Sequence, residues 1–300
     1  MKFIEKLPLP CLRILAAITQ RNPRVILSLR YFIWSHKWID WTNPRTLQEY
    51  VFKLIADGAK NPIKLKALAD MADKIKVREY VSRLAGEKYL PRLLGRWKRA
   101  EDINWDSLPQ KFAIKTNNGC GTNIIVRDKS NLNIKDAENN LKRWLKFPYG
   151  QLSGQPQYSA IEPEILAEEL LEIEGKPQAL PPDYKFFCFN GQPKFILYYE
   201  GRSVNGHITL NSVYDLDWNL IDSIVRRPVG HAVPRPKSMD DMIVLAKKLS
   251  HGVEFVRVDM YDINGKAVFG EMTFTPDVYT NFTDTFLEDA VKEFAKAQQH

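Results

Sequence analysis

Cysteine is scarce in this 300-residue chain, and long apolar runs are missing. The three cysteines, Cys11, Cys120 and Cys188, are isolated and show no C-x-x-C spacing. This argues against a disulfide framework or a zinc site and favours free thiols in a reducing compartment. No apolar run approaches the roughly 20 residues that a membrane-spanning helix needs, and Arg13 interrupts the weakly signal-like segment 7–18. We therefore expect a cytoplasmic protein.

Several common active-site signatures are also missing. The five histidines show no metal-ligand spacing and no neighbouring nucleophile motif, so we assign them no role. There is no Walker A loop and no G-x-G-x-x-G motif. Trp34, Trp38, Trp41 and Trp97 stand among basic residues, but no nucleic-acid module accompanies them. We expect these aromatic side chains to pack in the core.

The charge of the chain is distributed unevenly. Residues 1–115 carry 23 Lys/Arg against 11 Asp/Glu, whereas 116–300 carry 20 against 25. The basic first part indicates an anionic partner there, such as a phosphorylated substrate, an acidic polymer, a membrane surface or nucleic acid, or else a solvated helical face. The segment 21–38 could rest on a membrane surface, although the favoured interpretation is a helix packed on the main domain.

Helix signals dominate the first 100 residues, and strand signals follow. One helix is predicted to begin after Thr46 and end at Gly58, and another is capped by Asp73 and closed by Gly86. Strands at 111–115, 123–127, 164–171, 184–189 and 194–200, a helix at 238–249 and a closing helix at 285–299 follow. Because regular βαβ alternation is absent, the expected fold class is α+β.

A glycine-containing loop lies between the first two predicted strands. Lys115 ends one strand, and the loop 117–122 contains Gly119 and Gly121. Loop amides and a lysine can hold a phosphate, and glycine permits its close approach to the backbone. An ordinary hairpin loop is the alternative.

A second feature is the predicted hairpin formed by 255–261 and 269–274. Its strands are otherwise apolar, yet they carry Arg257, Asp259 and Glu271. A two-residue type I′ turn at Asn264-Gly265 would place the two carboxylates on opposite faces of the sheet. A turn with a G1 bulge at Gly265 would place them diagonally on one face, where a divalent cation could bind them. The metal site therefore requires the bulged turn, and solvated carboxylates are the alternative.

Together these segments resemble the ATP-grasp superfamily over about 43–274. The chain is similar to the branch associated with teichuronopeptide and capsular polysaccharide gene clusters through 73–81, 112–119, 183–191 and 255–261. The resemblance implies an ATP-grasp fold in which two α+β subdomains hold ATP. We expect a helical basic N-terminal region at 1–108, a glycine-loop subdomain at 109–180 and a metal-binding catalytic subdomain at 181–300.

The resemblance also implies roles for individual residues. Arg257 and Lys115 are the expected catalytic residues, and the metal ligands are Asp259, Glu271 and Thr273. Thr273 stands where many ATP-grasp enzymes have asparagine, so one or two Mg²⁺ ions are consistent with the sequence. The expected ATP-binding residues are Lys74, Lys115, Gly119, Gly121, Glu168, Glu169, Leu171, Asp183 and Lys185.

Three basic residues have an alternative interpretation. Arg78 is a substrate candidate that could instead pair with Glu79 or Glu87, and Arg202 is a candidate carboxylate anchor or an ordinary loop residue. Lys185 either contacts nucleotide or substrate, or lies in solvent. The segment 276–283 lacks the small glycine-containing loop expected after the metal strand.

The function implied is that of a Mg-ATP-dependent carboxylate–amine ligase. It would form an amide bond through an acyl phosphate on an acidic carbohydrate or peptide, in cell-surface polysaccharide or teichuronopeptide synthesis. The alternatives are a phosphotransferase or glycosyltransferase-associated enzyme, and a non-catalytic protein that binds an anionic polymer. We expect no nucleic-acid partner. Peripheral contact of the basic N-terminal region with the inner face of the membrane is a further alternative.

Overall fold

The computed structural model describes residues 11, 16–17, 22–176, 178–201, 210–221, 224, 231–278 and 281–295. It is a mixed structure of helices and two antiparallel sheets. The chain divides into two compact units whose segments alternate along the sequence. Unit 1 comprises Met1–Arg30, Ile55–Arg78 and Pro91–Leu170, and unit 2 comprises Tyr31–Leu54, Glu79–Leu90 and Leu171–His300.

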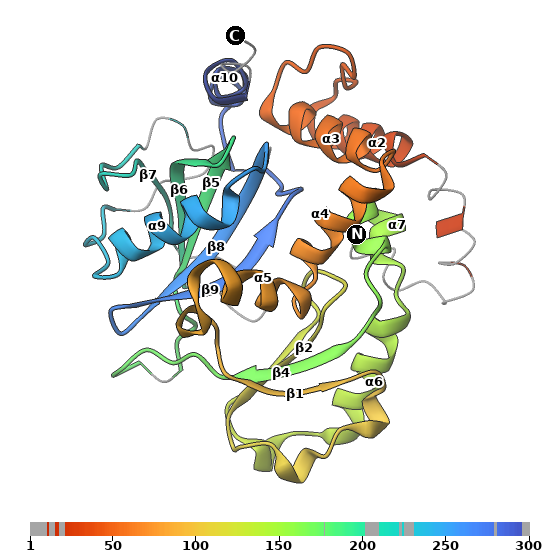
Figure 1. The fold of residues 1–300 in the computed structure, drawn as a ribbon, viewed down its shortest axis with the longest axis vertical. Helices are drawn as coiled ribbons and strands as arrows, with labels where there is room; N and C mark the ends of the chain where they lie inside the picture. The colour runs from red at the N-terminus through yellow and green to blue at the C-terminus, as the bar shows by residue number, and fades with distance from the viewer. Residues whose placement is uncertain are drawn as a thin grey trace. The chain divides into compact units, whose positions relative to one another are not determined.

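Unit 1 contains a four-stranded sheet with the order β1-β4-β2-β3 (Figure 1). Its strands are β1 (Leu93–Trp97), β2 (Phe112–Thr116), β3 (Asn123–Val126) and β4 (Ile165–Glu169). Strands β2 and β3 form the predicted hairpin around the glycine loop, and β4 pairs with the other edge of β2. Strand β1, which no sequence signal indicated, completes the sheet by pairing with β4.

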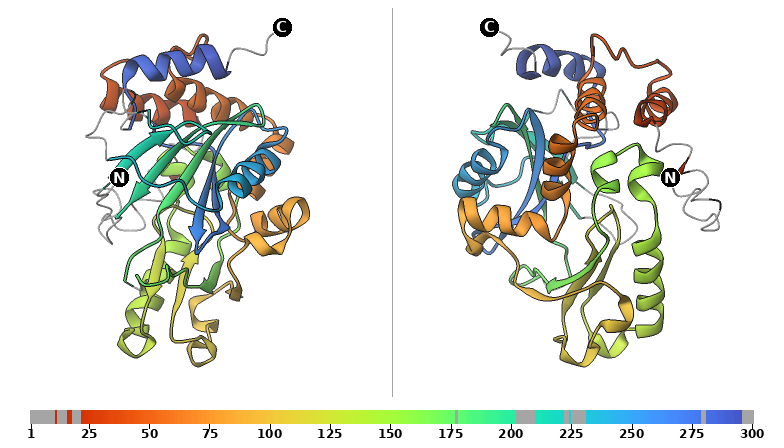
Figure 2. Two further views of the ribbon diagram at one scale, coloured as in Figure 1. Left: turned by 90° about the vertical axis from the view of Figure 1, so that its left-hand side faces the viewer. Right: turned by 45° about the vertical axis from the view of Figure 1, so that its right-hand side comes forward.

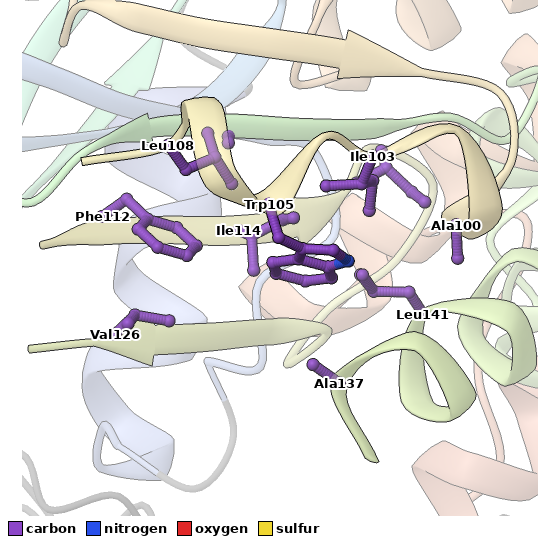
Figure 3. Packing of buried hydrophobic residues seen from close by; sticks show 11 residues of the cluster. Ala100, Ile103, Trp105, Leu108, Phe112, Ile114, Val126, Ala137 and Leu141 are labelled. Carbon is purple, nitrogen blue, oxygen red and sulfur yellow. The ribbon is translucent and has the colours of Figure 1, made fainter. Parts of the chain in front are cut away.

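Helix α6 (Ile134–Lys146) covers this sheet and closes the core of unit 1 (Figures 2 and 3). Ala137 and Leu141 lie four residues apart on the helix, so both face the sheet. They meet Phe112 and Ile114, which alternate on β2, and the ring of Trp105. The remaining buried members of the cluster are Ala100, Ile103, Leu108, Val126, Ile165 and Ala167.

Unit 2 contains a five-stranded sheet with the order β7-β6-β5-β8-β9. Its strands are β5 (Asp183–Phe189), β6 (Gln192–Glu200), β7 (Leu210–Tyr214), β8 (Phe255–Ile263) and β9 (Lys266–Thr273). Helix α9 (Met239–Ser250) packs along one face of the sheet through Met242, Leu245, Ala246 and Leu249 (Figure 2). Strand β5 is central and buried along its whole length, and its charged residues therefore need partners within the sheet.

Helices dominate the N-terminal region, as the sequence predicts. They are α2 (Pro23–Ser35), α3 (Leu47–Gly58), α4 (Pro62–Ala72) and α5 (Lys76–Ala85). Asn61 caps α4 through bonds from the amides of Ile63 and Lys64, and Gly86 follows α5 with a φ of 103°. Shorter helices are α7 (Tyr149–Ser153), α8 (Pro156–Ser159) and α10 (Asp284–Ala290), and a π-helical turn occupies Val291–Ala295. Within the described ranges, none of the helices has the length and apolar character needed to cross a bilayer.

Candidate functional site

The β8–β9 hairpin closes with a two-residue turn. Asn264 and Gly265 have φ values of 55° and 84°, and Ile263 pairs with Lys266, which is the type I′ pattern. The predicted G1 bulge at Gly265 is therefore wrong. Side-chain bonds favour the tighter turn: Asp262 Oδ1 accepts from the Gly265 amide at 2.7 Å, and Asn264 Oδ1 accepts from the Glu174 amide at 3.0 Å.

A bulge at Gly270 nevertheless brings the two carboxylates to one face. Met260 pairs with Phe269, but Asp259 pairs with Glu271, so Gly270 is an extra residue on β9. A Cβ atom at Gly270 would lie 3.0 Å from the backbone oxygen of Asp259 and 3.0 Å from Cε2 of Tyr261. The bulge thus depends on glycine, and it places Asp259 and Glu271 directly opposite each other rather than diagonally.

Arg257 links the candidate metal ligands. Its Nε donates to Asp259 Oδ1 at 2.6 Å, and its Nη2 contacts Asp259 Oδ2 at 2.7 Å, Thr273 Oγ1 at 3.1 Å and Glu271 Oε1 at 3.3 Å. Thr273 Oγ1 also donates to Glu271 Oε1 at 2.9 Å. Burial alone would lower the pKa of Arg257, but the charge and hydrogen bonds of Asp259 outweigh it and raise the pKa. One positively charged group is therefore surrounded by three side chains that offer oxygen ligands.

Lys185 is a second cation at Asp259. Its Nζ contacts Asp259 Oδ2 at 2.6 Å and Asp183 Oδ1 at 3.2 Å, because Lys185 and Asp259 are paired neighbours on β5 and β8. Lys185 is only 4% exposed, so the alternative that it lies in solvent is wrong. Lys185 therefore lies between two buried carboxylates, those of Asp183 and Asp259, and provides the opposite charge for both.

The oxygen set on β8 and β9 suits a hard divalent cation. In the described part of the chain, no group of three or more His, Cys, Asp and Glu residues could hold a metal by itself. However, Mg²⁺ bound to nucleotide phosphates is commonly held by only one or two carboxylates. Oxygen atoms of Asp259, Glu271 and Thr273 all lie within 3.3 Å of Nη2 of Arg257. The three side chains therefore direct oxygens at one positively charged group, as they would at a metal ion.

In unit 1, Glu168 on β4 binds two of the predicted cations. Lys115 Nζ lies 2.5 Å from Glu168 Oε2, and Arg78 Nη1 lies 2.5 Å from Glu168 Oε1. Arg78 also donates to the backbone oxygen of Pro91 at 2.7 Å, so it does not pair with Glu79 or Glu87 in the contacts that the structure describes. Glu168 is 6% exposed, and this buried carboxylate holds both side chains in place.

Lys74 lies against the glycine loop. Its Nζ donates to the backbone oxygen of Gly119 at 2.5 Å. Gly121 has a φ of 73°, a conformation that favours glycine, whereas a Cβ atom at Gly119 would make only ordinary contacts. The loop ends are tied together by the Thr116 amide, which donates to the oxygen of Thr122 at 3.1 Å.

Asn117 positions Lys74 and is a residue that the sequence analysis missed. Its Nδ2 donates to Asp73 Oδ1 at 3.0 Å, and its Oδ1 accepts from the Glu164 amide at 2.7 Å. Asp73 Oδ1 also accepts from the Ile75 amide at 2.8 Å, which shapes the turn that carries Lys74. Burial raises the pKa of Asp73 despite these bonds. The only sequence signal was the Asn117-Asn118 pair, which is equally typical of loops.

The other predicted residues occupy varied places. Glu169 ends β4, where its Oε1 accepts from the Arg92 amide at 2.8 Å, and Leu171 follows two residues later. Arg202 lies outside the described residues. After β9, Gln48 binds the segment that lacks the expected glycine loop: it donates to the oxygen of Pro276 at 3.4 Å and accepts from the Val278 amide at 3.1 Å. No local signal marked Gln48.

A family model supports the resemblance. The model for TupA-like ATP-grasp proteins matches residues 58–292, which is well over half of the chain. The chain belongs to the TupA-like ATP-grasp family. This confirms the predicted superfamily, its teichuronopeptide-related branch and the α+β ATP-grasp fold with a helical N-terminal region. ATP-grasp proteins are typically ATP-dependent carboxylate–amine ligases.

Comparison with solved structures finds similarity to ATP-grasp ligases. A D-alanine–D-alanine ligase from Bacillus anthracis complexed with ATP is 15% identical, with a TM-score of 0.42, and the match covers 74% of this chain and 60% of that one. The ATP-grasp ligase PsnB complexed with minimal precursor, Mg and ADP is 14% identical, with a TM-score of 0.37 and coverages of 70% and 52%. A phosphoribosylamine–glycine ligase from Thermotoga maritima is 12% identical, with a TM-score of 0.41 and coverages of 69% and 49%.

The match to this chain leaves a large part of each of these ATP-grasp ligases uncovered. The chain spans 60%, 52% and 49% of their respective lengths. A comparison with curated protein sequences finds no match.

Proposed function

We propose that this protein is a Mg-ATP-dependent carboxylate–amine ligase of cell-surface polysaccharide or teichuronopeptide synthesis. The observation that carries the proposal is the convergence of Asp259, Glu271 and Thr273 on one cationic nitrogen of Arg257. Family membership supports ATP as the nucleotide. The donor would be an acidic carbohydrate or peptide and the acceptor an amine.

The proposed reaction has two steps. An oxygen of the donor carboxylate attacks the γ-phosphorus of ATP, the bond to the β,γ-bridging oxygen breaks, and ADP leaves. The amine then attacks the carbonyl carbon of the acyl phosphate, inorganic phosphate leaves, and the amine loses a proton to solvent. Phosphoryl transfer needs little covalent help from the protein, so catalysis depends on positioning and on neutralising negative charge.

The residues of unit 1 are assigned to the nucleotide. Lys74 and Lys115 would neutralise phosphate charge, and the loop containing Gly119 and Gly121 would offer backbone amides. The contact of Lys115 with Glu168 supports this assignment, because it holds an otherwise flexible side chain in one orientation. The backbone from Glu168 to Leu171 would bind adenine.

The residues of unit 2 are assigned to the metal and the reacting phosphate. Asp259, Glu271 and Thr273 would hold Mg²⁺, which when bound neutralises phosphate charge. Arg257 would bind the phosphoryl group, and Asp183 would bind the ribose with Lys185 beside it. The short contacts of Lys185 and Arg257 with Asp259 hold that carboxylate in one orientation.

An ADP-release assay with paired substrates tests the function. Release of ADP that requires both a carboxylate donor and an amine, with an amide product detected by mass spectrometry, is the expected result. A stable phosphorylated product would instead indicate a phosphotransferase. Mg-ATP should also raise the melting temperature by several degrees at about 100 times its Kd. No shift at saturating Mg-ATP would favour the non-catalytic alternative.

A further inference from the structure

Helix α2 presents a stripe of apolar side chains to solvent. Val25, Leu29 and Ile33 are 60%, 48% and 63% exposed and follow one another at four-residue intervals, so they lie on one face of the helix. Trp38, which is 61% exposed, adds to this surface by stacking on Phe32, which lies three residues after Leu29 on the same side of the helix. Trp34 is 51% exposed but lies on the side of Leu27 and Tyr31, seven and three residues before it. Contiguous exposed apolar surface of this kind usually marks an interaction site.

The opposite face of α2 is fixed to the protein. Leu27 is fully buried and Tyr31 is 2% exposed, with the Tyr31 hydroxyl 3.3 Å from Thr46 Oγ1. Arg24 pairs with Asp57 at 2.7 Å, and Arg30 donates to the backbone oxygen of Ser153 at 2.6 Å. These apolar and polar contacts hold the helix in place, and the exposed stripe takes no part in them.

The aromatic end of the stripe is ordered by contacts of its own. The ring of Trp38 stacks on Phe32, with centroids 4.7 Å apart and an interplanar angle of 22°. Arg45 Nη2 donates to the backbone oxygen of Trp38 at 3.1 Å. A tryptophan held in an exposed position beside an arginine is typical of side chains that lie at a membrane–water interface.

The charges around the stripe are mostly positive. Helix α2 contains two arginines and no acidic residue, and Lys37, two residues after its end, is exposed. Between residues 22 and 60 there are six Lys/Arg against three Asp/Glu. Of these acids, Glu49 is fully buried beside Arg45 and Asp57 is shared by Arg24 and Lys60. The third is Asp40, which accepts hydrogen bonds from the amides of Thr42 and Asn43.

We propose that α2 docks the protein on an anionic lipid surface, with Val25, Leu29, Ile33 and Trp38 entering the interface. Apolar insertion flanked by Lys and Arg is the chemistry of interfacial helices, and the 13-residue helix suits lying on a bilayer. A second copy of the chain fits less well, because a symmetric contact through this face would bring two basic surrounds together. A protein acting on cell-surface polymer precursors would gain access to lipid-linked substrates, although the docking itself does not depend on the proposed function.

The test is co-sedimentation of the full chain with vesicles of phosphatidylcholine alone and of phosphatidylcholine mixed with phosphatidylglycerol. The protein should bind the mixed vesicles. Ile33→Asp should weaken this binding at least about tenfold, as expected for losing one buried aliphatic side chain. Ile63→Asp is the matched control, because Ile63 on α4 is 83% exposed but isolated from the stripe in sequence, and it should bind as the wild type does. Lys37→Glu should weaken binding to mixed vesicles by about fivefold or more.

Several outcomes would overturn the proposal. These are a wild-type protein that does not bind mixed vesicles, equal binding by Ile33→Asp and Ile63→Asp, or a dimer in light scattering that Ile33→Asp dissociates. Trp38→Gln provides a second variant in the stripe, to be used if Ile33→Asp melts well below Ile63→Asp. Because none of these positions is among the residues assigned to the reaction, ADP release in solution should remain unchanged in all the variants.

Discussion

Replacing Gly270 by alanine should separate the geometry of the candidate metal site from the general stability of the hairpin. The added Cβ atom would lie 3.0 Å from the backbone oxygen of Asp259 and 3.0 Å from Cε2 of Tyr261. Both neighbours must shift, and overpacking of this kind costs about 1–3 kcal/mol. The shift falls on the backbone of Asp259, whose carboxylate contacts Lys185 at 2.6 Å and Arg257 at 2.6 Å.

Gly265→Ala is the matched control in the same hairpin. Gly265 has a φ of 84°, so alanine there costs about 1–2 kcal/mol through backbone strain. Its Cβ atom would touch only the side chain of Lys237 at 3.6 Å, away from the opposed carboxylates. The two variants should therefore lose similar stability for different physical reasons, and only Gly270→Ala should disturb the opposition of Asp259 and Glu271.

The measurements are the urea midpoint of each variant and the Mg²⁺ dependence of ATP affinity by calorimetry. We expect comparable shifts in midpoint, with at least a tenfold loss of Mg²⁺-dependent ATP affinity for Gly270→Ala alone, which corresponds to about 1.4 kcal/mol. Equal ATP affinity in the two variants would refute the argument that the bulge aligns the metal ligands. A Gly270→Ala protein as stable as the wild type would refute the steric argument itself.

Three further predictions concern the assigned site. Glu271→Gln should lower ADP release at least about a hundredfold while changing the melting temperature little, because its side chain is 36% exposed; near-normal release would remove it from the metal site. Lys115→Ala should weaken ATP binding about tenfold or more relative to Lys111→Ala, in which the exposed neighbouring lysine serves as the control, and equal calorimetric affinities would contradict the phosphate role. Iodoacetamide at pH 8 should label the exposed Cys120, and Mg-ATP should reduce this labelling by covering the loop. Cys188 should stay unlabelled in the folded protein, because burial raises the pKa of its thiol to about 12. If peptide mass spectrometry found Cys120 labelled equally with and without Mg-ATP, this would count against nucleotide binding at the loop.

The hairpin shows how far local signals reach. The apolar alternation and Asn264-Gly265 predicted two strands and a turn, which the structure contains. The type of turn was predicted wrongly, because a G1 bulge seemed the only way to place both carboxylates on one face. A glycine inside a strand is itself a signal of a bulge, and Gly270 carried that signal. Its effect depends on how close the backbone of β8 comes, which is a property of the paired strands.

The ion pairs show a different limit. The sequence left Arg78 open between a substrate contact and a pair with Glu79 or Glu87, but Arg78 binds Glu168, which is 90 residues distant in the sequence. Likewise the sequence left solvent exposure open as the alternative for Lys185, and only the pairing of β5 with β8 brought Asp259 within its reach. The partner of a long charged side chain is chosen by whichever opposite charge the fold brings within reach, since burial makes an unpaired charge costly.

The sequence by itself determined the types of most elements, the family and the residue types available for chemistry. Helix limits such as Thr46 to Gly58 follow from capping and backbone preferences that act over a few residues. Only the tertiary structure decided the opposition of Asp259 and Glu271, the paired cations on Glu168, and the face of α2 that remains exposed. These depend on strand register and packing between distant segments, and a one-residue change of register reverses the face of every side chain.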